Sequence, residues 1–218
     1  MPKNFQSELD ELLSRIEQQN QNNLSNSSAK KPTLLLHACC GPCSSYVLEY
    51  LCRYFDITVL YYNPNIYPSE EYNRRLQELK DFYPKFPPAA NVKVIEAPYN
   101  PQEFYDAIDI AHNPDLATEP EKGERCRRCY ELRLRYSFDY ATSHNFDYFC
   151  TTLSISPFKD ATKLNTIGLR LSDSDKNPLW LVSDFKKKNG FKRSLELSSE
   201  YELYRQEYCG CIYSLQNR

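Results

Sequence analysis

Short apolar runs alternate with amphipathic stretches along most of the chain. The apolar runs predict strands at 33–37, 57–62, 92–97, 147–152 and 179–182. Between them, apolar side chains recur at helical spacing, which predicts helices at about 44–55, 69–83, 101–111, 124–144, 160–172 and 198–207. This alternation is typical of an α/β fold, with a Rossmann-like, mostly parallel sheet that carries helices on both faces.

The first 32 residues follow a different pattern. Residues 4–18 place apolar side chains on one helical stripe, and the stretch from Gln18 to Lys31 is rich in Gln, Asn and Ser. We therefore expect a peripheral N-terminal helix and a flexible linker over 1–32, and one folded domain over 33–218.

Composition and local sequence patterns exclude several classes of protein. The net charge is -2, so any contact with nucleic acid must come from a local patch. The sequence shows neither a secretory signal nor a membrane span, which predicts a cytoplasmic protein with no membrane partner. None of the five glycines forms a dinucleotide or phosphate loop, so we expect another protein to supply electrons for any redox chemistry.

Seven of the nine cysteines fall into three clusters: Cys39-Cys40-Gly41-Pro42-Cys43, Cys126-Arg127-Arg128-Cys129 and Cys209-Gly210-Cys211. In a reducing compartment, such clusters indicate metal binding or redox chemistry rather than structural disulfides. The first cluster follows the strand at 33–37, which places a metal site at the C-terminal edge of the strands. We expect the two other cysteines, Cys52 and Cys150, to lie in the core, and His37 to orient the cysteine loop.

The first two clusters together offer five thiolates. Cys126 and Cys129 share one face near a helix start, where the helix N-terminus is expected to lower the pKa of both thiols. This set suits a [4Fe–4S] cluster with a second metal or with one spare thiol. Two alternatives remain open: a structural Cys₄ zinc site in an RNA-binding module, and a thioredoxin-like dithiol oxidoreductase that uses Cys40 and Cys43.

The third cluster, Cys209-x-Cys211, allows several interpretations. A disulfide across one residue closes a small, strained ring that is easily reduced, so the pair suits a two-electron store. The pair could equally supply two further metal ligands or belong to a mobile tail.

Basic residues gather in two runs, Arg125 to Arg135 and Lys186 to Arg193. Both runs flank segments that we connect with the cysteine site. They would suit a polyanion such as RNA, although a charge run is usually a solvated face.

Six motifs occur in one order: His37-Ala38-Cys39-Cys40-Gly41-Pro42-Cys43, Tyr62-Asn63-Pro64-Asn65-Ile66-Tyr67-Pro68, Cys126-x-x-Cys129 with Arg133-Leu134, Thr151 to Pro157 with Lys159, Asp184-Phe185-Lys186-Lys187, and Tyr204-Arg205-Gln206-x-Tyr208-Cys209-Gly210-Cys211. Over about residues 33–214, this set resembles the QueH-type epoxyqueuosine reductases, the cobalamin-independent class.

The resemblance implies reduction of epoxyqueuosine to queuosine at the wobble position of a tRNA anticodon, the last step of queuosine biosynthesis. It implies a [4Fe–4S] cluster with an additional mononuclear iron. The implied cluster ligands are Cys39, Cys40, Cys126 and Cys129, with Cys43 ranked below them as a ligand of either metal. It also implies a redox-active disulfide between Cys209 and Cys211. Its partners would be the tRNA and an external electron-donor protein.

The strand pattern suggests where the substrate binds. Residues that follow the carboxyl ends of the predicted strands meet at one sheet edge, so we expect them to bind substrate: Asn63, Asn65, Ser154 and Ser156. Three lysines are expected to meet phosphates: Lys159, Lys186 and Lys187.

Overall fold

The structure is a computed structural model that describes residues 4–24, 30–172 and 178–216, and a five-stranded sheet forms its centre. The strands lie in the order β3-β2-β1-β4-β5, and every neighbouring pair is parallel. Their bounds are β1 (Thr33–His37), β2 (Asp56–Tyr61), β3 (Lys93–Glu96), β4 (Tyr148–Thr151) and β5 (Leu179–Trp180). The predicted parallel sheet is confirmed, although β5 is shorter than expected.

The strand order reverses at the centre of the sheet. From β1 the chain moves outward through β2 to β3, and it then returns to place β4 on the other side of β1. Parallel sheets bind ligands in the crevice outside the carboxyl ends of the strands at such a switch point. Here the crevice lies beyond His37 of β1 and Thr151 of β4, which are paired in register.

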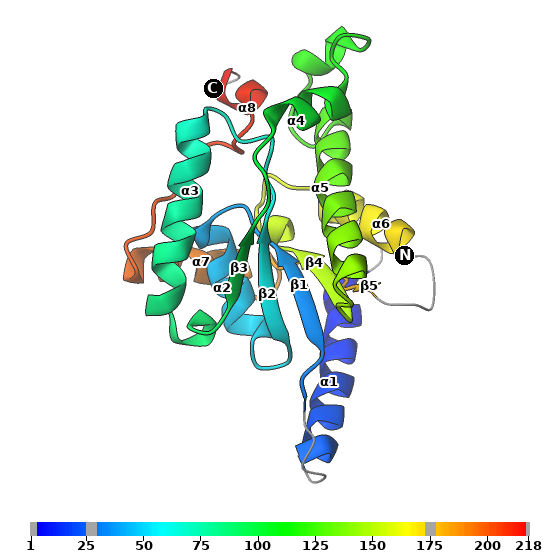
Figure 1. The fold of residues 1–218 in the computed structure, drawn as a ribbon, viewed down its shortest axis with the longest axis vertical. Helices are drawn as coiled ribbons and strands as arrows, with labels where there is room; N and C mark the ends of the chain where they lie inside the picture. Colours follow the sequence, from blue (N-terminus) through cyan, green and yellow to red (C-terminus); the bar gives the residue numbers. More distant parts are fainter. Residues whose placement is uncertain (1–3, 25–29, 173–177, 217–218) are drawn as a thin grey trace.

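Helices cover both faces of the sheet (Figure 1). Their bounds are α1 (Phe5–Leu24), α2 (Gly41–Leu51), α3 (Ser69–Phe82), α4 (Pro101–Ile108), α5 (Glu124–Ser143), α6 (Ala161–Leu171), α7 (Gly190–Glu200) and α8 (Ile212–Gln216), with a 3₁₀ turn η4 at Thr152–Ile155. Side chains alternate along β1: Leu34 and Leu36 pack with α1, α2 and α3, whereas Leu35 packs with α5 and α6. The strands are therefore buried on both sides, as their continuous apolar runs require.

The N-terminal helix differs from the prediction in two ways. It continues to Leu24, through polar residues that the sequence assigned to a linker. It is also not peripheral, because Leu9, Leu13 and Ile16 are buried in the same core cluster as β1 and α2. The apolar stripe at helical spacing thus marks a helix that docks on the core. The rest of the proposed linker includes 25–29, which lie outside the described residues.

Two helix predictions need correction. The helix expected at 198–207 is α7, which begins at Gly190 and ends at Glu200. The helix expected at 44–55 is α2, which begins earlier, at Gly41, with Pro42 in its first turn. In the described part of the chain, every helix is too short or too polar to cross a membrane.

Candidate active site

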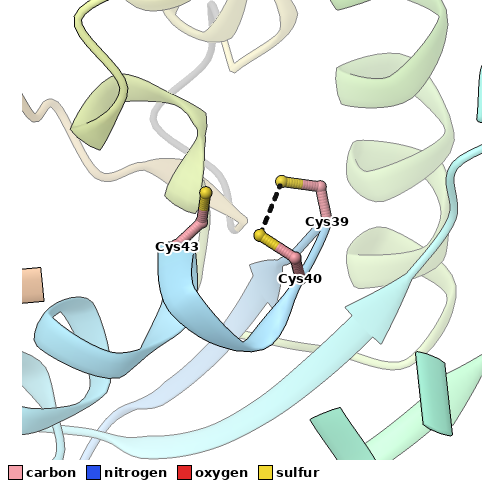
Figure 2. A group of neighbouring side chains, drawn as sticks. All are labelled: Cys39, Cys40 and Cys43. Atoms are coloured by element: carbon pink, nitrogen blue, oxygen red, sulfur yellow. Dashed lines mark hydrogen bonds between the residues drawn. The ribbon is translucent and has the colours of Figure 1, made fainter. Parts of the chain in front are cut away.

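Three thiols form a compact group at the carboxyl end of β1. Cys39 and Cys40 lie in the connection to α2, and Cys43 lies in the first turn of that helix. Their three sulfur atoms lie within 4.8 Å of one another, and Figure 2 shows all three on the same side of the loop. Cys39 and Cys40 are buried and Cys43 is partly buried. The first cysteine motif therefore folds into a potential metal site, as predicted.

The surroundings favour negative charge on only one of these three sulfurs. Hydrogen bonds from Cys40 and Cys43 lower the pKa of the Cys39 thiol well below its ordinary value. Burial raises the pKa of Cys40 to about 12, and hydrogen bonding to Cys39 raises that of Cys43. The Gln206 side chain donates to Cys40 Sγ over 3.0 Å, which brings the C-terminal segment onto the group. A bound cation would favour the thiolate form of all three sulfurs.

Cys126 and Cys129 lie one turn apart near the start of α5, as the sequence predicts, and both are buried. They stand outside the 4.8 Å group. Cys126 belongs to the buried cluster that contains Cys39 and Cys40, whereas Cys129 packs with Cys211. Burial raises the pKa of Cys126, and it raises that of Cys129 to about 11. The expected lowering by the helix N-terminus is therefore wrong, because the cost of burying a thiolate is larger.

Cys209 and Cys211 come from the C-terminal segment, and both are free thiols in this structure. Lys159 Nζ lies 2.8 Å from Cys209 Sγ. A hydrogen bond from Cys211, and then the Lys159 ammonium, lower the pKa of Cys209, whereas the same hydrogen bond raises that of Cys211. The pair thus consists of one sulfur that favours the thiolate and one that keeps its proton.

Contacts with α3 hold this segment in place. The Arg75 guanidinium donates to the carbonyls of Tyr208 and Cys209, and the Tyr67 amide donates to the Gly210 carbonyl over 2.7 Å. Gly210 has a φ of 113° and packs so closely on Arg75 that a Cβ would lie 3.1 Å from Nη1. The positive φ favours glycine between the two cysteines, and Arg75 leaves little room for a larger residue.

His37 fixes the geometry where β1 ends. Its Nε2 lies 3.0 Å from the Tyr62 carbonyl, and its Nδ1 lies 2.8 Å from Thr151 Oγ1. A carbonyl can only accept, so Nε2 carries the proton and Nδ1 accepts from Thr151. Burial lowers the pKa of His37 to about 3, which keeps the ring neutral. Both ring nitrogens are occupied, so His37 joins the ends of β1, β2 and β4, in agreement with the predicted orienting role.

The two asparagines expected to bind substrate lie deep beside the thiols. Asn63 donates to the Ala38 carbonyl over 2.9 Å, and Asn65 accepts from Arg133 over 2.8 Å. Both are buried, and each keeps one side-chain atom without a hydrogen-bond partner among the described residues, Oδ1 of Asn63 and Nδ2 of Asn65. These two atoms are the hydrogen-bonding capacity that the described residues leave unused.

The predicted serines and lysines have diverse environments. Ser154 is buried against Ser183, and Ser156 lines a cleft. Lys159 is buried and faces Cys209. Lys186 donates to the Ser154 carbonyl and forms an ion pair with Asp184. Lys187 is exposed. Of the three lysines, Lys187 has the exposure that contact with a phosphate requires.

A cleft of about 550 Å³ opens onto the thiols. Its lining includes Cys39, Cys43, Lys159 and Cys209 together with four aromatic side chains, from Phe158, Phe191, Tyr208 and Tyr213. This volume is typical of a small-ligand site, and aromatic walls suit a planar ring.

Comparison with known proteins identifies the family. A sequence model described as "Epoxyqueuosine reductase QueH" matches residues 34–217. The chain is 42% identical over 189 residues to the epoxyqueuosine reductase QueH of Staphylococcus aureus. The aligned region covers 85% of this chain and 77% of that protein. The chain belongs to the QueH epoxyqueuosine reductase family. It is also 41% identical over 186 residues to the QueH of Streptococcus pyogenes, covering 84% and 71% of the two chains, and 30% identical over 189 residues to that of Thermotoga maritima, covering 85% and 92%.

Family membership confirms the predicted resemblance. The thiol groups of this site are also suited to bind a metal. Three sulfurs within 4.8 Å can bind one metal or one cluster together, and thiolates are the ligands of zinc and of iron–sulfur clusters. The Arg75 guanidinium, buried beside this group, offsets negative charge on Cys40 and Cys39. The donor set therefore suits an anionic, sulfur-ligated centre.

Several arginines of the basic run from Arg125 to Arg135 contact other groups of the fold. Arg125 is buried and donates to the carbonyls of Leu116 and Ala117. Other arginines of this run form ion pairs with glutamates of α5: Arg127 and Arg128 with Glu124, and Arg127 and Arg135 with Glu131. Arg127 and Arg135 stay partly exposed, so contact of this run with a polyanion stays a prediction.

Sequence reasoning missed several residues of the site. Arg75 had no local signal, because its role depends on contact with a segment more than 130 residues away. Gln206 lies inside a motif and Phe158 lies between two of the motif residues, Pro157 and Lys159, but their positions next to Cys40 and at the cleft required the structure. Of the two cysteines expected in the core, Cys150 is buried and Cys52 packs partly buried against the core.

Proposed function

We propose that this chain reduces epoxyqueuosine to queuosine in tRNA with an iron–sulfur centre. The names of its relatives support the substrate and the reaction class. The observation that carries the proposal is the convergence of thiols from three distant segments. Thiols of the β1–α2 connection and of the C-terminal segment line one cleft, and those at the start of α5 pack in the same buried clusters.

The reaction removes one oxygen atom from the substrate. Conversion of the epoxide to the alkene consumes two electrons and two protons and releases water. Oxidation of Cys209 and Cys211 to a disulfide releases two electrons and two protons, so the pair balances one turnover. An external reductant, which we take to be an electron-donor protein, then restores the dithiol.

The proposed ligands of the [4Fe–4S] cluster are Cys39, Cys40, Cys126 and Cys129, and Cys43 is a further candidate for the cluster or the additional iron. When bound, the cluster would transfer single electrons, and the mononuclear iron would act as a Lewis acid. The chain itself positions the Cys209 thiol by the Lys159 ammonium and by the backbone contacts with Arg75. Lys159 Nζ also carries a proton that it can hold next to Cys209.

The cleft is suited to a nucleotide. Its volume of about 550 Å³ accommodates a modified base, and its aromatic walls can stack on one. The exposed Lys187, together with Lys192 next to Phe191, provides positive charge for the phosphates of the anticodon loop. Asn63 and Asn65 remain proposed substrate-binding residues; both are buried, and neither is part of the cleft lining.

The thioredoxin-like alternative is not favoured by the structure. A dithiol oxidoreductase needs an accessible thiol with a lowered pKa. Cys40 is fully buried and its pKa is raised to about 12, while that of Cys43 is also raised. The other alternative, a zinc-stabilised RNA-binding module, is tested by measuring the zinc, iron and sulfide content per chain.

The decisive measurement is iron, acid-labile sulfide and zinc per chain in protein purified without oxygen, together with turnover of an epoxyqueuosine-containing anticodon stem-loop. We expect about four sulfides and four to five irons per chain, by the stoichiometry of one [4Fe–4S] cluster with an added iron. Zinc near one without sulfide, and no conversion of the stem-loop, would contradict the proposal.

The role of the thiol pair has its own test. With a chemical reductant present, the Cys209→Ser enzyme should retain its iron and sulfide and lose at least tenfold in turnover, because the two-electron store is broken. Cys52→Ser, a partly buried thiol elsewhere on the core, is the matched control. Unchanged turnover in Cys209→Ser would exclude the electron-store role and leave the reductase assignment standing.

A further inference from the structure

Arg133 lies in the interior of the site with unused hydrogen-bonding capacity. It follows Cys129 by one turn of α5, and its side chain is only 2% exposed. Its Nη1 donates to Asn65 Oδ1 over 2.8 Å and lies 3.9 Å from Cys129 Sγ. Within the described residues, its Nε and Nη2 have no hydrogen-bond partner. Buried donors without partners are costly, so a native site is expected to provide them with an acceptor.

The charge of Arg133 is also unmatched by any carboxylate. In the described part of the chain, the ion pairs include Arg75 with Glu71, but none involves Arg133. Guanidinium groups stay protonated in proteins, and a buried charge needs an opposite charge nearby. The groups within reach that can carry negative charge are sulfurs, of Cys129 first and then of Cys39 and Cys209, and a bound cation would favour their thiolate form.

The two observations lead to the same partner. A centre ligated by four thiolates carries net negative charge, and its sulfur atoms accept hydrogen bonds. Cys39 and Cys129, both close to Arg133, are among the thiols proposed as ligands. Asn65 fixes one side of the guanidinium, so the remaining N–H groups are held in place rather than free to rotate toward solvent.

We infer that Arg133 is the counter-charge and hydrogen-bond donor of the sulfur-ligated centre, and that it raises the reduction potential of that centre. The inference rests on the proposed iron–sulfur function. A positive charge stabilises the reduced, more negative state, and hydrogen bonds to sulfur act in the same direction. Arg133 is thus a positioning and tuning residue that acts through the centre.

The test is a reductive titration of anaerobically purified holoenzyme, followed by absorbance and electron paramagnetic resonance. We expect a more negative midpoint potential in Arg133→Gln, which lacks the charge, and a smaller shift in Arg133→Lys, which keeps the charge and loses the planar fork. Arg135→Gln removes the same charge from the exposed face of α5, where the side chain is 55% exposed, and should titrate like the wild type. Equal potentials in all four proteins would overturn the inference.

A second measurement covers the case in which Arg133→Gln fails to hold its cluster. In protein labelled with ¹⁵N-arginine, pulsed electron paramagnetic resonance of the reduced centre should detect guanidinium nitrogens of Arg133 and of Arg75, which is also buried beside the thiols. The Arg133 contribution should disappear in Arg133→Lys, and a spectrum identical to that of the wild type would overturn the inference. Absence of sulfide from the wild-type protein would instead refute the proposed function itself, so the two failures are distinguishable.

Discussion

At the scale of single residues, Phe158 is the clearest link between the fold and a nucleic-acid substrate. Its ring is 65% exposed, the largest value among the exposed large hydrophobic side chains of the described residues. The Phe158 amide donates to Ser156 Oγ over 3.2 Å, and the next residue, Lys159, is buried against Cys209. A turn fixed on both sides therefore presents an apolar ring at the cleft beside the reactive thiols.

If that ring stacks on a base, Phe158→Ala should weaken binding of the anticodon stem-loop roughly tenfold, since stacking on an aromatic side chain contributes about 1–3 kcal/mol per base. The exposed position means that the free energy of unfolding should stay unchanged. Fluorescence anisotropy with a labelled stem-loop measures the affinity, with Phe158→Tyr and Leu169→Ala, an exposed leucine on α6, as controls. Wild-type affinity in Phe158→Ala would show that the ring does not contact RNA.

The lysines show what sequence can and cannot predict about single residues. A lysine in a motif indicates a charge near the site, and the structure places Lys159 there. The sequence could not tell that its ammonium turns inward to a sulfur rather than outward to a phosphate. That choice depends on the C-terminal segment, which lies 50 residues farther along the chain.

At the scale of elements, the start of α5 determines where Cys126 and Cys129 lie. Glu119 precedes the helix and accepts from the amides of Glu124 and Arg125, over 2.7 and 2.8 Å. A Cβ on Gly123 would lie 2.1 Å from the Glu119 carboxyl carbon, so the glycine makes room for this cap. A carboxylate at a helix N-terminus satisfies free amides and complements the helix dipole.

Glu119→Ala should therefore lower the free energy of unfolding by about 1 kcal/mol, the usual contribution of a helix cap. In metal-free protein, the looser helix start should also make Cys126 react faster with iodoacetamide. Urea unfolding and timed alkylation measure the two effects, with Asp115→Ala on the same exposed connection as the control. A stable Glu119→Ala protein with unchanged thiol reactivity would show that the cap is dispensable.

Helix α7 shows why one element was misplaced. It begins at Gly190, where a Cβ would lie 2.0 Å from the Phe185 carbonyl and 2.4 Å from Tyr46. This close approach depends on contact with α2, which local propensity does not report. Ser198, where the predicted helix begins, lies near the end of α7, and its hydroxyl donates to the Ser194 carbonyl within that helix. The regular strands and α3, α5 and α6 were predictable because their apolar periodicity agrees with their tertiary burial.

At the scale of the whole molecule, the two ends of the sheet differ in what they carry. The carboxyl ends of the strands carry the thiols, and Figure 1 shows α4 and α8 at that upper end and α1 at the lower end. Helix α1 closes one face of the core through Leu9, Leu13 and Ile16. The spacing of apolar residues predicts this stripe. The polar residues that follow it gave no indication that the helix packs on the core.

Leu13→Ala should lower the free energy of unfolding by about 2–5 kcal/mol, the range for deleting a buried leucine side chain. The exposed Glu11→Ala on the same helix should have little effect. Urea unfolding measures the free energy of unfolding of both variants.

Deletion of the first 32 residues tests the predicted division into 1–32 and 33–218. Because α1 packs on the core, we expect a marked loss in the free energy of unfolding. An undiminished free energy would show that residues 33–218 fold independently.

The separation of the thiols along the chain has a consequence for folding. Cys40 and Cys126 are 86 residues apart in sequence, yet they belong to one buried cluster. A centre that binds both closes a long loop, as a cross-link does, and so restricts the unfolded chain more than the folded one. By chain-entropy arguments a loop of that length is worth about 4–5 kcal/mol, comparable with the entire stability of many small domains. The proposed reaction centre would then also be a structural staple, and its loss would endanger the fold as well as the chemistry.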